Sequence, residues 1–275
     1  MKNIQFSVLI SVYSKERADY LTLSLKSITS DQTLIPDEVV LVKDGPLTPE
    51  LDSVCKEYAA LYPNIFKIVA LPENVGLGRA LNEGLNHCSY ELVARMDSDD
   101  VSKPNRFERQ IEVFESNPDL DIVSAWIEEF EYDSANAVSI KKLPEDHFSI
   151  FKYAKKRCPI NHPVAMFKKS EVLLAGGYLD MHLYEDYYLW VRMLMGGSKF
   201  YNIQESLLSF RYSTETIKRR GGIKYANTEI KFFKELRKLG LINYAEFLKT
   251  IFVRVVARVI PNGFRVLLYQ KLLRR

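Results

Sequence analysis

The sequence has few cysteines and no strong excess of either charge. Three of its 275 residues are cysteine, Cys55, Cys88 and Cys158, and no two of them form a CxxC pair. This argues against a disulfide framework or a zinc site and favours a reducing cytoplasm. Lys and Arg total 38 against 35 Asp and Glu, a formal net charge of +3. Nucleic-acid-binding proteins usually have a larger basic excess, so we expect no nucleic-acid partner.

Long apolar runs are also missing. A membrane-spanning helix needs about 20 consecutive apolar residues, and Lys, Arg, Glu or Pro interrupts every apolar run of this chain. The N-terminal segment MKNIQFSVLISVYSKER lacks a small-residue cleavage site, so it predicts a buried first strand rather than a signal peptide. With 47% hydrophobic residues, the chain can bury one substantial core. We therefore expect a globular protein whose contact with a membrane would be peripheral.

Short apolar runs rich in Val, Ile and Leu alternate with amphipathic stretches from residue 6 to about residue 130. This alternation is typical of the strands and crossover helices of a parallel sheet. The predicted strands are Phe6–Tyr13, Glu38–Lys43, Phe66–Leu71 and Leu92–Met96, and the predicted helices are Tyr20–Thr29, Pro49–Leu61 and Leu77–His87. We expect an α/β fold with a Rossmann-like, mostly parallel sheet flanked by helices.

The pattern loosens after residue 130. A Pro-punctuated stretch is followed by the strand-like HPVAMFK, by a helix containing EDYYLWVRM and by mostly helical sequence. Gly221 and Gly222 mark a break before the last helices. We predict that residues 1–222 form one catalytic domain, divided into halves at residues 130 and 131, with the second half building the other wall of a cleft. Residues 223–275 are predicted to form a C-terminal helical appendage.

The strongest local signal is the acidic segment DSDD at residues 97–100, directly after the fourth predicted strand. Carboxylates packed together repel one another unless a hard cation such as Mg²⁺ or Mn²⁺ takes their oxygens, together with those of a substrate diphosphate. The alternative is a solvent-facing turn in which Asp100 or Ser102 caps a helix beginning near Pro104. The segment alone leaves both readings open.

Two further polar loops are predicted at the same edge of the sheet. Asp44 follows the second strand, and NVGLGR at residues 74–79 leads into the third helix. Ligands of such sheets bind beyond the carboxyl ends of the strands. A strand-end aspartate can accept hydrogen bonds from a nucleobase, and an arginine at a helix start can contact a diphosphate. Asp44 and Arg79 suit these roles, although each loop also has a purely structural reading as a turn.

Five segments together carry a family resemblance: SVLISVYSKERADYLTLSLKSI, VVLVKDG, NVGLGRALNEGL, VARMDSDD and EDYYLWVRM. In this order they resemble the motifs of the family 2 glycosyltransferases, which have a GT-A fold. The resemblance spans about residues 4–215. Segments such as HPVAMF, FRYS and RRGG are similar to those of bacterial transferases that build O-antigen, capsule and exopolysaccharides such as amylovoran.

The resemblance implies roles for the residues of the first half, which would bind the nucleotide. Ser11, Val12 and Tyr13 would pack around the nucleobase, Asp44 would bind the uracil, Arg79 would contact the nucleotide, Asp97 would contact the ribose or the metal, Asp99 would ligate Mn²⁺ or Mg²⁺, and Asp100 would support the loop. Two positions depart from the family pattern. Lys43 precedes Asp44 where a second acid is common, and Ser14 follows Tyr13 where Asn is frequent.

The second half would bind the acceptor. By resemblance, Asp186 is the general base, with Glu185 as the alternative; first-turn acids on an amphipathic helix would be the structural reading. His162 is a tentative acceptor contact, although a lone histidine before a proline is more often structural. Arg219 and Arg220 would close a flap over the pyrophosphate or else lie solvated. Trp126 and Trp190 are expected in the core.

The chain has no acidic residue from Phe247 to its end, while basic residues interrupt the apolar segments TIFVRVVARVI and FRVLLYQKLL. Basic amphipathic helices of this kind lie on anionic inner-leaflet lipids with their apolar side chains buried. The alternative is that they pack on the catalytic domain or in a dimer. Both readings stay open.

The sequence therefore predicts a metal-dependent, inverting glycosyltransferase. It would use a UDP-sugar, with UDP-galactose or UDP-glucose favoured, and an undecaprenyl-diphosphate-linked saccharide, at the cytoplasmic face of the bacterial membrane. One alternative is a sugar nucleotidyltransferase, but such enzymes usually have a Gly-rich phosphate loop after the first strand, where this chain has SKER. The other is an inactive nucleotide-sugar-binding protein that would have lost Asp99 or Asp186, and both are present.

Overall fold

The computed structural model describes residues 4–212 and 223–259. In the first half, the strands are β1 (Phe6–Val12), β2 (Glu38–Lys43), β3 (Phe66–Ala70) and β4 (Leu92–Asp97), and the helices are α1 (Ala18–Ser27), α2 (Pro49–Leu61) and α3 (Leu77–His87). The predicted βα units are confirmed, and α2, α3 and β2 have the predicted bounds. Three strands and α1 differ from the prediction by one or two residues at their ends, where local sequence is least informative.

The elements after β4 no longer follow strict βα alternation. They are β5 (Val101–Ser102), α4 (Arg106–Ser116), β6 (Ile122–Phe130), β7 (Ser139–Lys141), α5 (His147–Ala154), the 3₁₀ turn η1 (His162–Val164), β8 (Met166–Lys168), α6 (Lys169–Leu174), α7 (Glu185–Gly196) and β9 (Phe200–Arg211). The C-terminal pair is α9 (Ile223–Lys238) and α10 (Tyr244–Val259). The strand expected within HPVAMFK is restricted to β8, because η1 takes its first three residues.

One mixed sheet runs through both halves, with the order β3-β2-β1-β4-β8-β6-β9-β5 and with β7 paired to β6. The strands from β3 to β4 are parallel. β8 then runs antiparallel to both β4 and β6. Since β8 lies between β4 and β6, the second half extends the sheet of the first instead of forming a sheet of its own.

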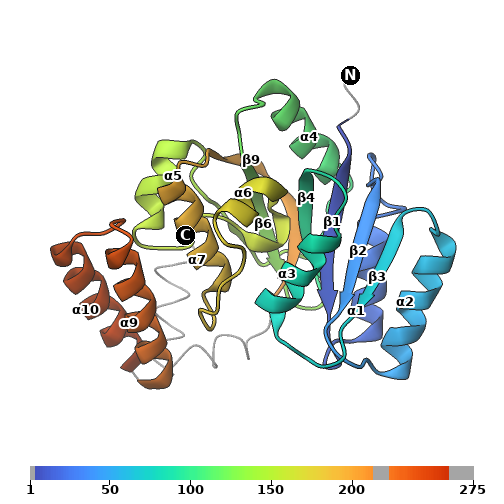
Figure 1. Ribbon diagram of the computed structural model, residues 1–275, viewed down its shortest axis with the longest axis horizontal. Helices are drawn as coiled ribbons and strands as arrows, with labels where there is room; N and C mark the ends of the chain where they lie inside the picture. Colours follow the sequence, from blue (N-terminus) through green and yellow to red (C-terminus); the bar gives the residue numbers. More distant parts are fainter. Residues whose placement is uncertain (1–3, 213–222, 260–275) are drawn as a thin grey trace.

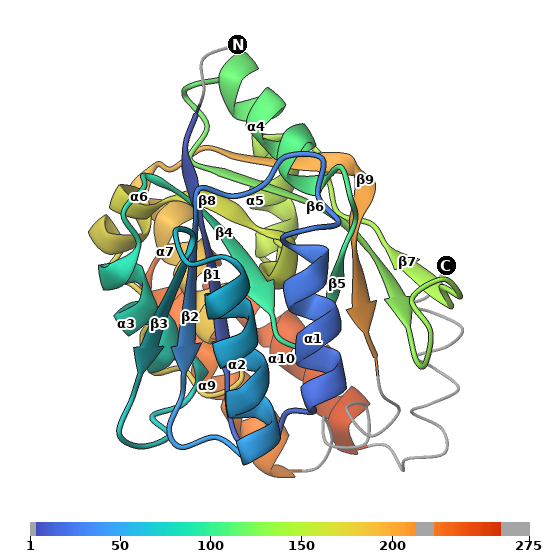
Figure 2. The ribbon, with the colours of Figure 1, turned by 90° about the vertical axis from the view of Figure 1, so that its right-hand side faces the viewer.

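Helices cover both faces of the sheet (Figures 1 and 2). Apolar side chains of α1, α2 and α4 form one core cluster with one face, and those of α3, α6 and α7 form a second cluster with the other. Each fully buried Leu, Val or Phe contributes about 1.5–3 kcal/mol through removal from water. At Gly84 of α3 a Cβ would lie 2.3 Å from a methyl of Leu9, so glycine allows α3 to approach the sheet closely.

The helices α9 and α10 lie at the side of the molecule next to α5 and α7, away from β1 to β3 (Figure 1). Their inward side chains, including Phe232, Phe233 and Leu236, are buried in the same cluster as those of α7. Within the basic tail that begins at Phe247, Phe247 and Ile251 are partly buried and pack against this cluster, as the packing reading predicts for that part. The segment FRVLLYQKLL lies outside the described residues. No helix in residues 4–212 and 223–259 is both long and apolar enough to cross a bilayer.

Candidate active site

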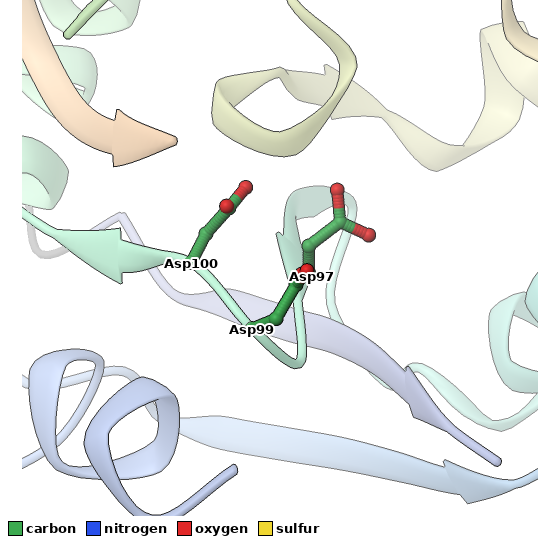
Figure 3. Close-up of side chains that lie close together, drawn as sticks. All are labelled: Asp97, Asp99 and Asp100. Atoms are coloured by element: carbon green, nitrogen blue, oxygen red, sulfur yellow. The ribbon is translucent and has the colours of Figure 1, made fainter. Parts of the chain in front are cut away.

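Three carboxylates converge in the short turn that joins β4 to β5 (Figure 3). Asp97 is the last residue of β4, and Asp99 and Asp100 follow in the turn. One oxygen from each lies within 4.8 Å of the others. The reading in which Asp100 or Ser102 caps the next helix is wrong, because α4 begins at Arg106 and is preceded by Asn105.

The environment of this acidic turn opposes its negative charge. Burial, and then the charges of Asp97 and Glu16, raise the pKa of Asp99 to about 7. Burial also raises the pKa of Asp100 well above its usual range, since this side chain is fully buried. One Asp100 oxygen accepts the Arg211 amide at 2.8 Å, and the other has no hydrogen-bond partner among the described residues. Crowded acids and an unpaired buried oxygen fit a hard divalent cation such as Mn²⁺ or Mg²⁺, which prefers oxygen ligands.

Two arginines that the sequence did not single out hold the turn. Arg95 of β4 is 1% exposed and forms an ion pair with Asp97, two residues along the same face of the strand. Arg211, at the end of β9, donates from Nε to the Asp99 carbonyl oxygen at 2.9 Å, and its guanidinium lies 3.7 Å from the centre of the Tyr20 ring. The segments VARMD and FRYS contain these residues, but the sequence shows neither that the Arg95 head is buried beside Asp97 nor that Arg211 contacts a turn more than 100 positions away.

The predicted nucleotide residues lie at the same edge of the sheet. Ser11 of β1 is level with Asp97 of β4 in the strand register. Val12 is buried, and its carbonyl accepts the Asp44 amide at 2.8 Å, whereas Tyr13 is 43% exposed beside them. The structure thus brings together the strand ends that the sequence predicted to meet, and the contacts with a nucleobase stay predictions.

Asp44 organises the loop that leads into α3. Its carboxylate accepts the backbone amides of Val75 at 2.7 Å and Gly76 at 3.2 Å, and the side-chain amide of Asn74 at 3.1 Å. Since Asp44 is 4% exposed, this structural role is clear. Its contact with uracil stays a prediction. Arg79 lies exposed in the first turn of α3, and its contact with the nucleotide stays a prediction.

The other carboxylate pair begins α7. Burial raises the pKa of both Glu185 and Asp186, and an Asp186 oxygen lies 3.8 Å from the thiol of Cys158. At Gly78 of α3 a Cβ would lie 3.5 Å from the Glu185 side chain and 3.4 Å from that of Tyr178. The start of α3 therefore meets the start of α7, and the charge of Arg95, the partner of Asp97, also acts on the Asp186 carboxyl.

Buried rings connect the two sides. His162 is 9% exposed, its Nε2 lies 2.9 Å from the Tyr178 hydroxyl, and its ring packs edge-on against Trp190. Burial lowers the pKa of His162 well below its usual value, so the ring is neutral. This surrounding explains the histidine as a packed, hydrogen-bonded residue, and contact with an acceptor stays a prediction. Trp190 lies in the core as expected.

The remaining predictions concern Trp126, which was expected in the core, and the arginine pair expected in a flap. Trp126 of β6 is only partly buried; the Lys142 ammonium lies 4.9 Å from its ring centre, and its indole N–H donates to the Leu143 carbonyl at 3.0 Å. The expectation of a fully buried core residue is wrong at this position. Arg219 and Arg220, proposed for a flap, lie outside the described residues.

The family model for glycosyl transferase family 2 matches residues 7–173, which contain β1 to β8 and the acidic turn. The chain belongs to glycosyl transferase family 2. This family 2 glycosyltransferase is 45% identical, over 98% of its length and 97% of the relative's, to the UDP-Gal:alpha-D-GlcNAc-diphosphoundecaprenol beta-1,3-galactosyltransferase of Escherichia coli. It is 37% identical to an amylovoran biosynthesis glycosyltransferase of Erwinia amylovora, over 97% of the chain and 98% of the relative.

Solved structures confirm the GT-A fold of this glycosyltransferase. Staphylococcus aureus TarS in complex with UDP-GlcNAc matches with a TM-score of 0.68 at 16% identity, over 95% of this chain and 75% of that one. A mannosyltransferase of Pyrobaculum calidifontis in complex with GDP-Man and Mn²⁺ matches with a TM-score of 0.65 at 18% identity, over 97% of this chain and 79% of that one. At such identities the likeness concerns the fold.

Proposed function

We propose that this family 2 glycosyltransferase moves a hexose, with inversion, from a UDP-sugar onto a saccharide linked to undecaprenyl diphosphate in the assembly of a bacterial surface polysaccharide. UDP-galactose is the first choice of donor and UDP-glucose the second. The Escherichia coli relative, 45% identical over nearly the whole length of both chains, is named for a UDP-galactose donor and a diphosphoundecaprenol-linked acceptor. Its name also describes a β linkage.

The observation that carries this proposal is the pairing of two separate acidic groups in one site. The acidic turn at residues 97–100 lies at the carboxyl ends of the parallel strands, and Asp186 lies at the start of α7, which meets the start of α3 at Gly78. A transferase needs one group to hold the donor diphosphate and another to activate the acceptor. The two acidic groups suit these two tasks.

On the donor side, Asp97, Asp99 and Asp100 would hold Mn²⁺ or Mg²⁺. When bound, the cation neutralises the charge that develops on the departing diphosphate. The chain itself contributes the fixed geometry, since Arg95 and Arg211 hold the turn before any ligand arrives. Ser11, Val12, Tyr13, Asp44 and Arg79 are the proposed nucleotide contacts.

On the acceptor side, Asp186 would take the proton of the attacking hydroxyl. The acceptor oxygen forms a bond to the anomeric carbon while the bond between that carbon and the diphosphate oxygen breaks, and UDP leaves on the opposite face. Burial raises the pKa of Asp186, which makes its carboxylate a better proton acceptor than an exposed aspartate. Glu185, beside it, is the alternative base.

The outer face of α10 supports a peripheral location at the inner face of the cytoplasmic membrane. Tyr244, Leu248 and Phe252 recur every four residues and are 50–71% exposed, with Lys249 exposed beside them. A helix with an exposed apolar stripe and basic flanks binds anionic lipid surfaces. We expect flotation with phosphatidylglycerol vesicles at low salt, and loss of flotation in a Leu248→Asp/Phe252→Asp variant. A wild-type protein that stays at the bottom of the gradient would sink the membrane assignment.

A donor panel tests the reaction. Transfer from UDP-galactose, UDP-glucose, UDP-GlcNAc and UDP-GalNAc to a synthetic lipid-diphosphate saccharide would be measured with Mn²⁺, with Mg²⁺ and with EDTA. We expect galactosyl transfer that EDTA abolishes and that Asp99→Ala and Asp186→Asn each reduce by at least about a hundredfold. No turnover with any UDP-sugar would favour a protein that only binds nucleotide-sugar, and full activity of Asp186→Asn would move the base elsewhere.

A further inference from the structure

The start of α7 contacts the C-terminal helices through one buried chain of polar groups. Tyr184, directly before Glu185 and Asp186, donates from its hydroxyl to Glu229 of α9 at 3.0 Å. The same Glu229 oxygen lies 2.6 Å from Arg254 of α10. Glu229 is 1% exposed, so its charge depends on these partners.

Aromatic side chains also pack the start of α7 against α9. The rings of Tyr184 and Phe232 are stacked with their centres 4.5 Å apart and an interplanar angle of 14°. Phe232 also packs against Tyr187, one residue after Asp186, with ring centres 4.6 Å apart. A single side chain of α9 therefore contacts the residues on both sides of the acidic pair.

The helical pair also supports the second segment that touches Asp186. Arg254 donates to the carbonyl of Lys156, and Lys155 forms an ion pair with Glu246 of α10 at 2.9 Å. Cys158, two residues beyond Lys156, has its thiol 3.8 Å from an Asp186 oxygen. Both neighbours of the Asp186 carboxylate, the start of α7 and the segment before Cys158, are thus fixed by α9 and α10.

The backbone before α7 needs such support. Leu183 has a φ of 69°, the left-handed region that a branched side chain adopts only at a cost. This strained residue lies three positions before Asp186. Strained conformations persist where surrounding contacts over-determine them, and the Tyr184 contacts supply that restraint.

We propose that α9 and α10 set the position of the Asp186 carboxylate, with Tyr184 and Glu229 as positioning residues. The inference rests on the proposed role of Asp186 as the base. It assigns to α9 and α10 a role on the acceptor side of the reaction. Among the described residues, no hydrogen bond or ion pair joins these helices to the acidic turn, so the geometry of the turn does not depend on them.

The test uses Tyr184→Phe, which removes one oxygen and keeps the stacked ring, and Glu229→Gln, which removes the charge. Glu235→Gln is the matched control, because Glu235 is on the same helix and pairs with Lys238 on the surface. For each full-length protein, kcat for transfer, the Kd for UDP with Mn²⁺ by calorimetry and the thermal midpoint would be measured.

We expect kcat to fall about 10- to 100-fold in Tyr184→Phe and Glu229→Gln, since a displacement of about 1 Å at a reacting group costs that much. The Kd for UDP with Mn²⁺ would stay within twofold of wild type, and Glu235→Gln would match wild type throughout. If Glu229→Gln does not fold, Tyr184→Phe decides alone.

Wild-type kcat in the folded Tyr184→Phe variant overturns the inference, and so does a parallel loss of UDP affinity, which indicates a general structural effect. Asp186→Asn separates this failure from that of the proposed function. If Asp186→Asn is inactive and Tyr184→Phe is fully active, only the positioning role is wrong. If Asp186→Asn is fully active, the assignment of the base is wrong and the inference falls with it.

Discussion

The donor side and the acceptor side of this site are built in different ways. The donor carboxylates come from four consecutive residues in one turn, at the end of a buried strand that pairs with its neighbours on both sides. The contacts of Asp186 and of the residues beside it, in contrast, come from segments that are distant in sequence: Cys158 lies beside Asp186, Gly78 of α3 beside Glu185, and Phe232 of α9 beside Tyr184 and Tyr187. A local motif brings the carboxylates of the acidic turn together, whereas the surroundings of Asp186 depend on the tertiary structure.

We expect the largest effect on the acidic turn from substitution of Arg95, because this buried cation pairs with Asp97. In Arg95→Met the Asp97 carboxylate loses the partner that orients it. Removing the hydrogen-bonding or ionic partner of a metal-ligating residue typically lowers the metal affinity by about 10- to 100-fold. We expect a loss of this size in the affinity for Mn²⁺ in the presence of UDP, measured by calorimetry. Arg95→Lys, which keeps the charge, should lose less, and equal affinity in Arg95→Met and wild type would contradict the role.

A smaller effect is expected at the rings that connect the two sides. Tyr178→Phe removes the hydroxyl that bonds the buried His162 ring. An unsatisfied buried polar group costs about 1–3 kcal/mol, which for a chain of this size lowers the thermal midpoint by roughly 2–10 °C. Scanning calorimetry measures the shift. Tyr132→Phe, at an 87% exposed position, is the control and should leave the midpoint unchanged; no shift in Tyr178→Phe would indicate that the bond contributes little.

The smallest effect concerns pH. The pKa of Asp99 is raised from 3.8 to about 7 in the folded, metal-free protein, so folding favours its protonated form. Its contribution to stability is present at low pH and is lost as the pH rises from about 4 to 7. At pH 8 with EDTA, Asp99→Asn should therefore raise the thermal midpoint, by about 2–4 °C for each 1 kcal/mol regained.

Asp52 provides the control of opposite sign. Hydrogen bonds from Lys43 and Lys56 lower its pKa from 3.8 to about 2, so its contribution is present above pH 4 and lost as the pH falls toward 2. Asp52→Asn should not raise the midpoint at pH 8. A lower midpoint for Asp99→Asn than for wild type in metal-free buffer at pH 8 would refute the electrostatic account of the acidic turn.

Sequence reasoning was most successful where structure follows from local patterns. Alternating apolar runs gave the four parallel strands with α1, α2 and α3, and the order of polar loops placed Asp44 and Asp97 at one edge of the sheet. Arg95 was missed because an arginine within a strand pattern does not reveal that its head is buried beside Asp97. The partial exposure of Trp126 was missed because an apolar run does not show which of its residues lie on the less covered face of β6.

The acceptor side was less predictable for a physical reason. The EDYYLWVRM segment indicated a helix with acids in its first turn, but the contact of Tyr184 with Glu229 joins positions 45 residues apart. The acidic turn shares this difficulty only where Arg211 contacts it from more than 100 residues away. Periodicity and capping carry no information over such separations. Only the resemblance to a family supplied the role of Asp186, and that role awaits the experiments above.

The pairing of β5 with β9 also joins the acidic turn to a strand that is synthesised more than 100 residues later. The backbone amide of Arg211 in β9 donates to the Asp100 carboxylate, and its guanidinium donates to the Asp99 carbonyl. A nascent chain that ends before β9 therefore carries the acidic residues without these two contacts.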